Sequence, residues 1–139
     1  MTRAVFDTNV IVSGFLSAGG PPGRIVEWLR AGVIRAVLDD RVTAEYADVL
    51  ARPRFGLPQA EVRIVLAAIE QAAHRIEVGP TDAARGLPDV SDAPFLECAR
   101  AEGVPLVTGN IRHYPRAAAR DVTVLTPAQY VESLNRLLR

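Results

Sequence analysis

The chain has 139 residues, of which 49% are apolar and 23% are charged, and its formal net charge is zero. This length suits one domain with one hydrophobic core, so we expect a single domain over residues 1–139. The composition excludes a disordered chain, and the balanced charge indicates no particular binding partner. All basic residues are arginine, and residues 110–139 carry five of them against Asp121 and Glu132, which fits either a solvated surface or a nucleic-acid face.

Cys98 is the single cysteine, which excludes an internal disulfide framework and is compatible with a reducing compartment. It shares one helical face with Phe95 and Ala99, so a buried thiol is expected. No apolar run approaches the roughly 20 residues of a membrane helix, and the first residues lack the order of a secretory signal. We therefore expect a cytoplasmic protein without a membrane partner.

Apolar spacing and breaker residues predict alternating strands and helices. In chain order, these are strand 4–6, helix 10–16, loop 17–23, helix 25–29, strand 34–38, helix 42–51, helix 58–73, strand 76–78, loop 79–89, helix 92–103, strand 105–108, strand 122–125 and helix 126–138. Asp39, Ser91 and Thr126 are the expected N-caps, and Thr126 opens a capping box that Gln129 completes. Gly32 is an expected helix stop.

Short strands that alternate with helices imply right-handed crossovers and a mostly parallel sheet. We therefore expect a three-layer α/β/α domain with four to five strands. In such sheets, sites form in the crevice outside the carboxyl ends of the strands. The polar residues just after each strand are consequently the first candidates for function.

Several polar residues occupy those positions. Asp7 and Asn9 follow the first strand, Glu45 lies in the helix after the second, Asp92 opens the helix before strand 105–108, and Asn110 follows that strand. Glu45 is the least easily explained by local structure, because Val42 and Val49 place it on or beside the apolar stripe of its helix.

Each of the other positions also has a purely structural explanation. Asp7 could cap its helix, and Asp92 and Asp89 could favour a helix N-terminus through its dipole. Asn110 could be an ordinary turn residue. The convergence of the candidates carries more weight than any one of them.

Three carboxylates in one cleft require a compensating cation, since two unit charges about 4 Å apart repel by roughly 4 kcal/mol at an effective dielectric near 20. Oxygen ligands without a cysteine cluster favour Mg²⁺ or Mn²⁺ over zinc. A metal so held can activate water against a phosphodiester. The chain has no G-x-S-x-G, Walker or G-x-G-x-x-G motif, which argues against triad hydrolysis and dinucleotide chemistry.

Four stretches, in this order, resemble the PIN-domain nucleases, in the branch of bacterial toxin–antitoxin toxins. They are Val5–Val10, Thr43–Leu50, Asp89–Ala99 and Leu106–Asn110. The resemblance implies a Mg²⁺- or Mn²⁺-dependent endoribonuclease, usually dimeric and often neutralised by a small antitoxin.

The resemblance also implies roles for individual residues. Asp7, Glu45 and Asp92 would be the catalytic acids that bind metal, and Asn110 the fourth catalytic position. Asn9, Thr108 and Asp89 would support the acids or the substrate. Two positions depart from the family pattern, since Ser91 and the uncharged Asn110 stand where acids are expected, so a second metal is left open.

His113 lies three residues after Asn110 and could contact phosphate or aid proton transfer. Arg112 and Arg116 flank it and could hold an RNA backbone. Two other functions stay open from the residues alone. One is a metal-dependent phosphatase with Asp7 as nucleophile, although Asn9 stands where that class has a second acid. The other is a catalytically silent RNA-binding module.

Overall fold

The structure is a computed structural model that describes residues 2–138. The strands are β1 (Arg3–Phe6), β2 (Arg35–Leu38), β3 (His74–Arg75), β4 (Leu106–Val107) and β5 (Val124–Leu125). The α-helices are α1 (Thr8–Leu16), α2 (Pro21–Ala31), α3 (Asp40–Leu50), α4 (Gln59–Ala72), α5 (Ala93–Glu102), α6 (Arg116–Ala119) and α7 (Pro127–Leu138). Short 3-10 turns are η1 (Pro53–Phe55), η2 (Ala83–Gly86), η3 (Val90–Asp92) and η4 (Ile111–His113).

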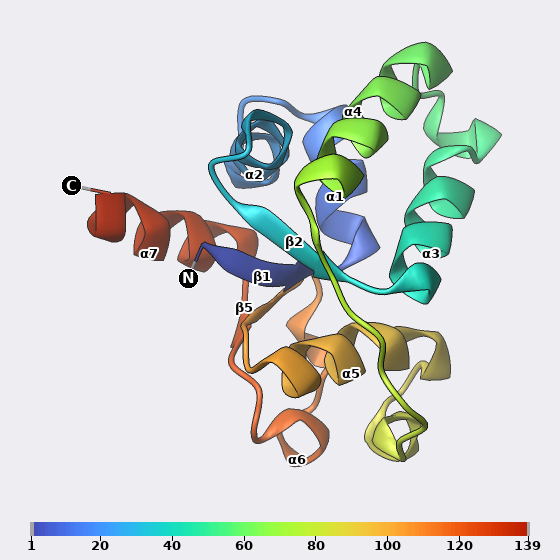
Figure 1. The fold of residues 1–139 in the computed structure, drawn as a ribbon, viewed down its shortest axis with the longest axis vertical. Helices are drawn as coiled ribbons and strands as arrows, with labels where there is room; N and C mark the ends of the chain where they lie inside the picture. The colour runs from blue at the N-terminus through green and yellow to red at the C-terminus, as the bar shows by residue number, and fades with distance from the viewer. Residues whose placement is uncertain (1, 139) are drawn as a thin grey trace.

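The strands form one five-stranded, all-parallel sheet in the order β3-β2-β1-β4-β5. The order reverses at β1, because β2 and β3 follow on one side and β4 and β5 on the other. Crossover helices cover the sheet on both faces: Figure 1 shows α1, α2 and α4 on one side of β1 and β2, and α5 on the other. The expected α/β class and mostly parallel sheet of four to five strands are confirmed, and the sheet has five strands that are all parallel.

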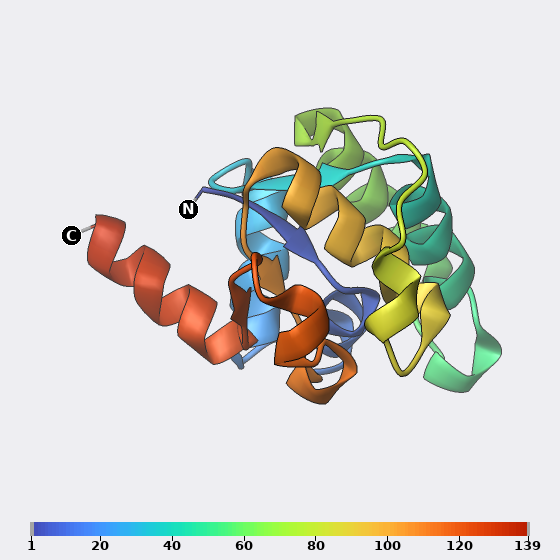
Figure 2. The ribbon, with the colours of Figure 1, turned by 90° about the horizontal axis from the view of Figure 1, so that it is seen from below.

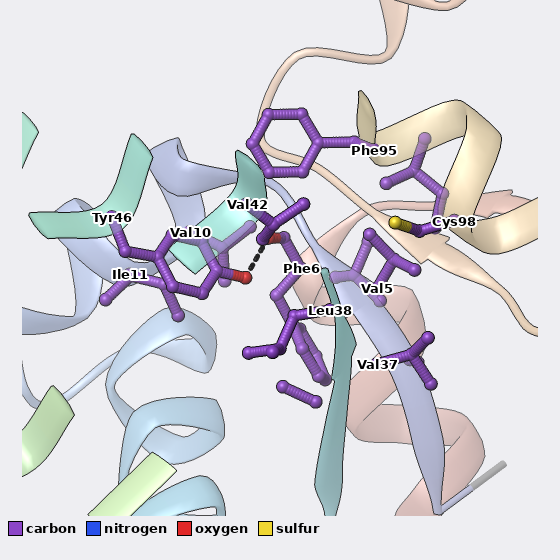
Figure 3. Close-up of a cluster of buried hydrophobic side chains, with 14 of the residues drawn as sticks. Val5, Phe6, Val10, Ile11, Val37, Leu38, Val42, Tyr46, Phe95 and Cys98 are labelled. Carbon is purple, nitrogen blue, oxygen red and sulfur yellow. Dashed lines mark hydrogen bonds between the residues drawn. The ribbon is translucent and has the colours of Figure 1, made fainter. Parts of the chain in front are cut away.

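The core lies between these layers and is built from fully buried strand residues such as Val5, Phe6 and Leu38. Figure 3 shows Phe6 among side chains of α1, α3 and β2, with Phe95 and Cys98 contributed by α5. Burial of each large apolar side chain contributes about 1.5 to 3 kcal/mol to stability. The predicted burial of Cys98 is confirmed.

The C-terminal helix α7 packs its buried Tyr130 and Leu134 inward, and the Phe6 and Tyr130 rings meet edge to face at 5.5 Å. Its far end reaches away from the rest of the chain (Figure 2), where Leu137 and Leu138 are exposed. Across residues 2–138, no helix has the length and apolar character needed to cross a membrane.

The predicted caps are mostly confirmed. The Asp39 carboxylate accepts the backbone N–H groups of Arg41 and Val42 at the start of α3, and Thr126 and Gln129 form the reciprocal capping box of α7. Gly32 ends α2 with a positive φ of 77°, a conformation that glycine adopts without steric cost.

Three local predictions are wrong. Ser91 does not cap α5: residues 90–92 form a 3-10 turn that Asp89 caps, and Asp92 stands at the N-cap position of α5. The third strand is His74–Arg75 rather than near 76–78, because it pairs with the last two residues of β2 and the Ile76 N–H makes the final bond, to the Leu38 carbonyl. The loop predicted over 17–23 ends early, since Pro21 opens α2 at a position where proline loses no hydrogen bond.

Candidate active site

The candidate site lies where the strand order reverses, between the carboxyl ends of β1 and β4. Asp7 follows β1, and its backbone N–H donates to the Val107 carbonyl of β4 at 2.9 Å. Thr108 follows β4 directly. Ligands of open α/β sheets bind at this kind of switch point. Pairing of β1 with β4 therefore brings together residues about 100 positions apart in the sequence.

Asp7 is buried, with 5% of its surface exposed, and its carboxylate is held by hydroxyl groups. Its Oδ2 accepts bonds from Thr108 Oγ1 at 3.0 Å and Tyr114 Oη at 2.9 Å, and a longer one from Asn9 Nδ2 at 3.4 Å. Asp7 occupies the N-cap position of α1, yet its side chain makes no cap bond there. Helix capping therefore does not explain this acid.

Asn9 and Thr108 lie on either side of Asp7 and are joined by hydrogen bonds. Asn9 Oδ1 accepts the Gly109 N–H at 2.9 Å, and Asn9 Nδ2 approaches Thr108 Oγ1 at 3.4 Å. Thr108 Oγ1 in turn accepts the backbone N–H of Asn110 at 3.0 Å. The turn after β4 is thus tied to the start of α1, and the carboxylate of Asp7 is oriented by both.

Asp92 opens α5 and is paired with His113 across the site, with 3.0 Å between its Oδ2 and His113 Nδ1. Its side chain is 12% exposed and makes no cap bond. Burial, followed by the negative charges of Asp7 and Asp89, raises the pKa of Asp92 to about 6, although His113 opposes the shift. Asp92 therefore shares an electrostatic environment with Asp7 in which negative charge is not fully balanced.

Glu45 lies half-buried on α3. Burial raises the pKa of Glu45, and the charge of Asp7 raises it further while Arg52 lowers it. The neighbouring residue Tyr46 anchors α3 to the end of β1, because its hydroxyl donates to the Phe6 carbonyl, drawn as the dashed line in Figure 3. Glu45 thus belongs to the same electrostatic group as Asp7.

The remaining predicted residues are more peripheral. Asn110 is half-buried, and within residues 2–138 its side chain forms no hydrogen bond, which leaves its amide available. Asp89 is exposed and holds the N–H and hydroxyl of Ser91 rather than another of the predicted site residues. Arg112 is exposed beside His113.

The donor set fits a hard divalent cation in its chemistry. Burial raises the pKa of Asp7, Glu45 and Asp92, and Asp7 acts on the other two through its charge. Only oxygen donors are available from these residues, as Mg²⁺ prefers. As the side chains stand, however, no three His, Cys, Asp or Glu groups of residues 2–138 converge closely enough to hold one ion.

Tyr114 is a residue of the candidate site that sequence reasoning missed. It is 2% exposed, and its hydroxyl and that of Thr108 are both directed at Asp7 Oδ2. No motif marks it, since it reaches Asp7 only through the fold of residues 108–114. Its position one residue after His113 is the sole sequence signal that could have drawn attention to it.

A second missed group ties the two helices that carry Glu45 and Asp92. Arg41 of α3 donates to Asp39 Oδ2 and to Glu97 Oε1 of α5, each at 2.8 Å. The Thr81 hydroxyl donates to the other oxygen of Glu97. Both carboxylates are only 7% exposed, so this cluster holds α3 against α5. Cys98 lies beside Asp39, and burial raises its pKa to about 12, which makes the thiol unreactive.

Tyr114→Phe is expected to lower metal affinity by about 10-fold at pH 7, because a hydrogen bond to a charged group is worth about 1.5 kcal/mol. The Tyr114 hydroxyl lowers the pKa of Asp7 against the effect of burial. Its removal should therefore move the pH at which metal binding is half complete upward. Calorimetric titration with Mn²⁺ between pH 5 and 8 measures both effects. The matched control is Tyr130→Phe, which removes the hydroxyl of another buried tyrosine, one whose ring packs edge to face on Phe6. An equal loss of affinity in both variants would contradict a specific role for Tyr114.

The fold and site together define an α/β domain with buried acids at the switch point of a parallel sheet. A family model described as a PIN domain matches residues 3–112, well over half of the chain. The chain therefore belongs to the PIN-domain family, and the resemblance inferred from its motifs is confirmed at that level. PIN domains are typically nucleases that bind nucleic acid and generally use divalent metal ions. Among curated proteins, no relative matches the chain.

Proposed function

We propose that this protein is a Mg²⁺- or Mn²⁺-dependent endoribonuclease whose acids are Asp7, Glu45 and Asp92, with Asn110 as a fourth polar group. The observation that carries the proposal is the uncompensated negative charge at the switch point. Asp7 is buried and acts through its charge on both other acids, and capping accounts for neither Asp7 nor Asp92. Such a site is stabilised by a cation, and family membership supports nuclease chemistry.

A divalent ion bound by these carboxylates would lower the pKa of a water molecule and balance charge on the phosphodiester. The chain's own residues have separate tasks. Thr108, Tyr114 and Asn9 all bond Oδ2 of Asp7, so a cation would be held through Oδ1. His113 keeps Asp92 in place through Nδ1 and is 40% exposed, so its Nε2 is free to contact a phosphate oxygen. Arg112 adds positive charge on the same turn.

The direct test is cleavage of a labelled single-stranded RNA by the purified protein with Mg²⁺, with Mn²⁺ or with EDTA. Cleavage is expected with either metal and none with EDTA. Asp7→Asn, purified in parallel, should lose at least about 100-fold in rate, since metal-assisted charge stabilisation is worth several kcal/mol. Single-stranded DNA under the same conditions defines the substrate class.

Two results would overturn the proposal in favour of the other functions left open by the sequence. RNA binding without metal-stimulated cleavage would identify a silent RNA-binding module. A covalent phosphate trapped on Asp7 would identify an aspartyl phosphatase. Equal cleavage by Asp7→Asn and the parent protein would show that the acids were assigned wrongly.

Asn110→Asp is expected to increase Mn²⁺ affinity by about 10-fold, because a fourth carboxylate supplies charge that the amide lacks. The same change should lower the unfolding temperature of the metal-free protein, since it adds negative charge to an already repulsive group. Metal titration and thermal unfolding with and without EDTA measure the two effects. Unchanged affinity would place Asn110 outside the metal site.

We further propose that the protein acts in the cytoplasm as the toxin of a toxin–antitoxin pair, as a homodimer inhibited by a small cognate antitoxin. Support comes from the motif resemblance to that branch of the family. A short open reading frame directly upstream, whose product blocks RNA cleavage by this protein, would establish the role. Light scattering of the purified protein tests the dimer, and a mass of one chain would contradict it.

A further inference from the structure

A cavity lies beside Tyr114, the residue whose hydroxyl bonds Asp7. It has a volume of about 370 Å³, within the range of about 300 to 1,000 Å³ that small-molecule sites occupy. Apolar side chains of Ala119, Val122 and Val124 line it together with Tyr114, and Arg116 and Arg120 bring positive charge. We call this cavity the Tyr114 pocket.

Tyr114 is shared by the pocket and the acid site. Its hydroxyl donates to Asp7, while the same side chain lines the pocket. Ile111, the residue after Asn110, also lines the pocket and is 40% exposed. The pocket and the Asp7 carboxylate are therefore linked through one residue, Tyr114.

The two arginines of the pocket are free to bind an anion. Both are exposed, and neither forms a salt bridge within the described chain, although the charge of Arg120 acts on the neighbouring Asp121. Arg100 nearby differs, because Asp121 holds its guanidinium at 2.6 Å. Planar guanidinium groups recognise phosphate through paired hydrogen bonds and also stack on flat rings.

We infer that the Tyr114 pocket binds one nucleoside unit of the RNA strand next to the cleaved phosphodiester, with its phosphate on Arg116 and Arg120. The combination favours a nucleotide, because a largely apolar wall suits a base while two exposed arginines suit its phosphate and can stack on flat rings. The identification of the ligand as part of an RNA strand rests on the proposed function. The pocket would thereby set the register of the strand across the acids.

The test uses adenosine and uridine 5′-monophosphates as probes, followed by NMR of the backbone amides of the whole protein in EDTA. Binding is expected to shift signals of residues 111–124. Ribose 5-phosphate, which lacks the base, should bind about 5-fold to 100-fold more weakly, the worth of one base contact. Equal binding of ribose 5-phosphate and both nucleotides, or shifts that map elsewhere, would overturn the inference.

Two variants separate the base contact from the phosphate contact. Val122→Trp fills the pocket without changing charge and should abolish the advantage of nucleotides over ribose 5-phosphate. Arg116→Gln with Arg120→Gln should weaken all three ligands. The matched control, Arg63→Gln with Arg85→Gln, removes two exposed arginines outside the pocket and should change nothing. Circular dichroism checks the fold of each variant, and an equal loss in the control pair would contradict the inference.

Because no metal is present, this experiment does not depend on cleavage. Nucleotide binding in the pocket of a protein that cleaves no RNA would support the pocket and overturn the proposed nuclease. RNA cleavage without nucleotide binding at residues 111–124 would overturn the pocket alone.

Discussion

Asp92→Asn is expected to lose at least about 100-fold in metal-dependent RNA cleavage and, without metal, to unfold at a higher temperature than the parent protein. The two effects have one cause. The pKa of Asp92 is raised from 3.8 to about 6, first by burial and then by the charges of Asp7 and Asp89. The ionised carboxylate that would bind metal is thus costly to the folded chain, by up to about 3 kcal/mol.

The sign of the pH dependence follows from this shift. Between pH 3.8 and about 6, folded Asp92 keeps its proton while the unfolded chain has released it, so this group makes the parent protein less stable as pH rises. The amide that replaces this carboxyl group in the variant carries no charge at any of these pH values. The stability gain of Asp92→Asn should therefore be full above pH 6 and disappear as pH falls below 3.8. Metal affinity of the parent protein should rise through the same window.

Thermal unfolding of both proteins at pH 4, 5.5 and 7.5, with EDTA and with Mg²⁺, measures these effects. Mg²⁺ should stabilise the parent protein and leave Asp92→Asn nearly unchanged. Asp82→Asn is the control, because Asp82 is exposed and its side chain caps no N–H group. A variant that is less stable than the parent at pH 7.5 would show that the bond to His113 outweighs the repulsion.

Arg41→Met is expected to destabilise the fold by about 2 to 4 kcal/mol at pH 7. Removal of one partner from a buried ion pair leaves the other charge uncompensated, at a cost of about 3 to 5 kcal/mol, which the partial exposure of Arg41 reduces. The substitution keeps most of the apolar stem but leaves Asp39 and Glu97, both 7% exposed, without their guanidinium. Arg41 lowers the pKa of Asp39, so the stability that this pair provides is present at neutral pH and lost as pH falls through that lowered pKa.

Arg52→Met provides a control just after the C-terminal end of α3, because Arg52 pairs with Asp48, whose side chain is 71% exposed. Exposed pairs contribute at most about 1 kcal/mol. Urea unfolding of both variants gives the comparison. Adding Glu97→Gln to Arg41→Met should recover part of the loss, since it removes one of the two unpaired charges. Equal stability of Arg41→Met and Arg52→Met would contradict the role of the cluster.

The cluster around Arg41 also bears on activity, because α3 carries Glu45 and α5 begins next to Asp92. Its loss should loosen the spacing between two of the proposed metal ligands. Cleavage by Arg41→Met should consequently fall even at temperatures where the variant is folded, a result that Arg63→Met, at an exposed position of α4, should not show. Measurement of both rates well below the unfolding temperature provides the check.

The sequence by itself determined the order of the five strands and the six longer helices, the parallel sheet and the family, while α6 and the 3-10 turns were not predicted. Those features depend on local patterns: apolar runs of strand length, helical spacing, and caps such as Asp39 and Thr126 whose partners lie within three residues. Glu45 could be predicted as a candidate site residue for the same reason, because its position beside an apolar stripe is a property of one helix.

Only the tertiary structure decided which side chains meet. Tyr114 reaches Asp7 across 107 positions, and Arg41 reaches Glu97 across 56, because β1 pairs with β4 and α3 packs beside α5. At Asp7 the local pattern predicts a helix cap, and Asp7 does stand at a cap position. Its carboxylate is instead held by the hydroxyl groups of Thr108 and Tyr114, which follow β4. Pairwise contacts of this kind depend on strand order, and strand order is a property of the whole sheet.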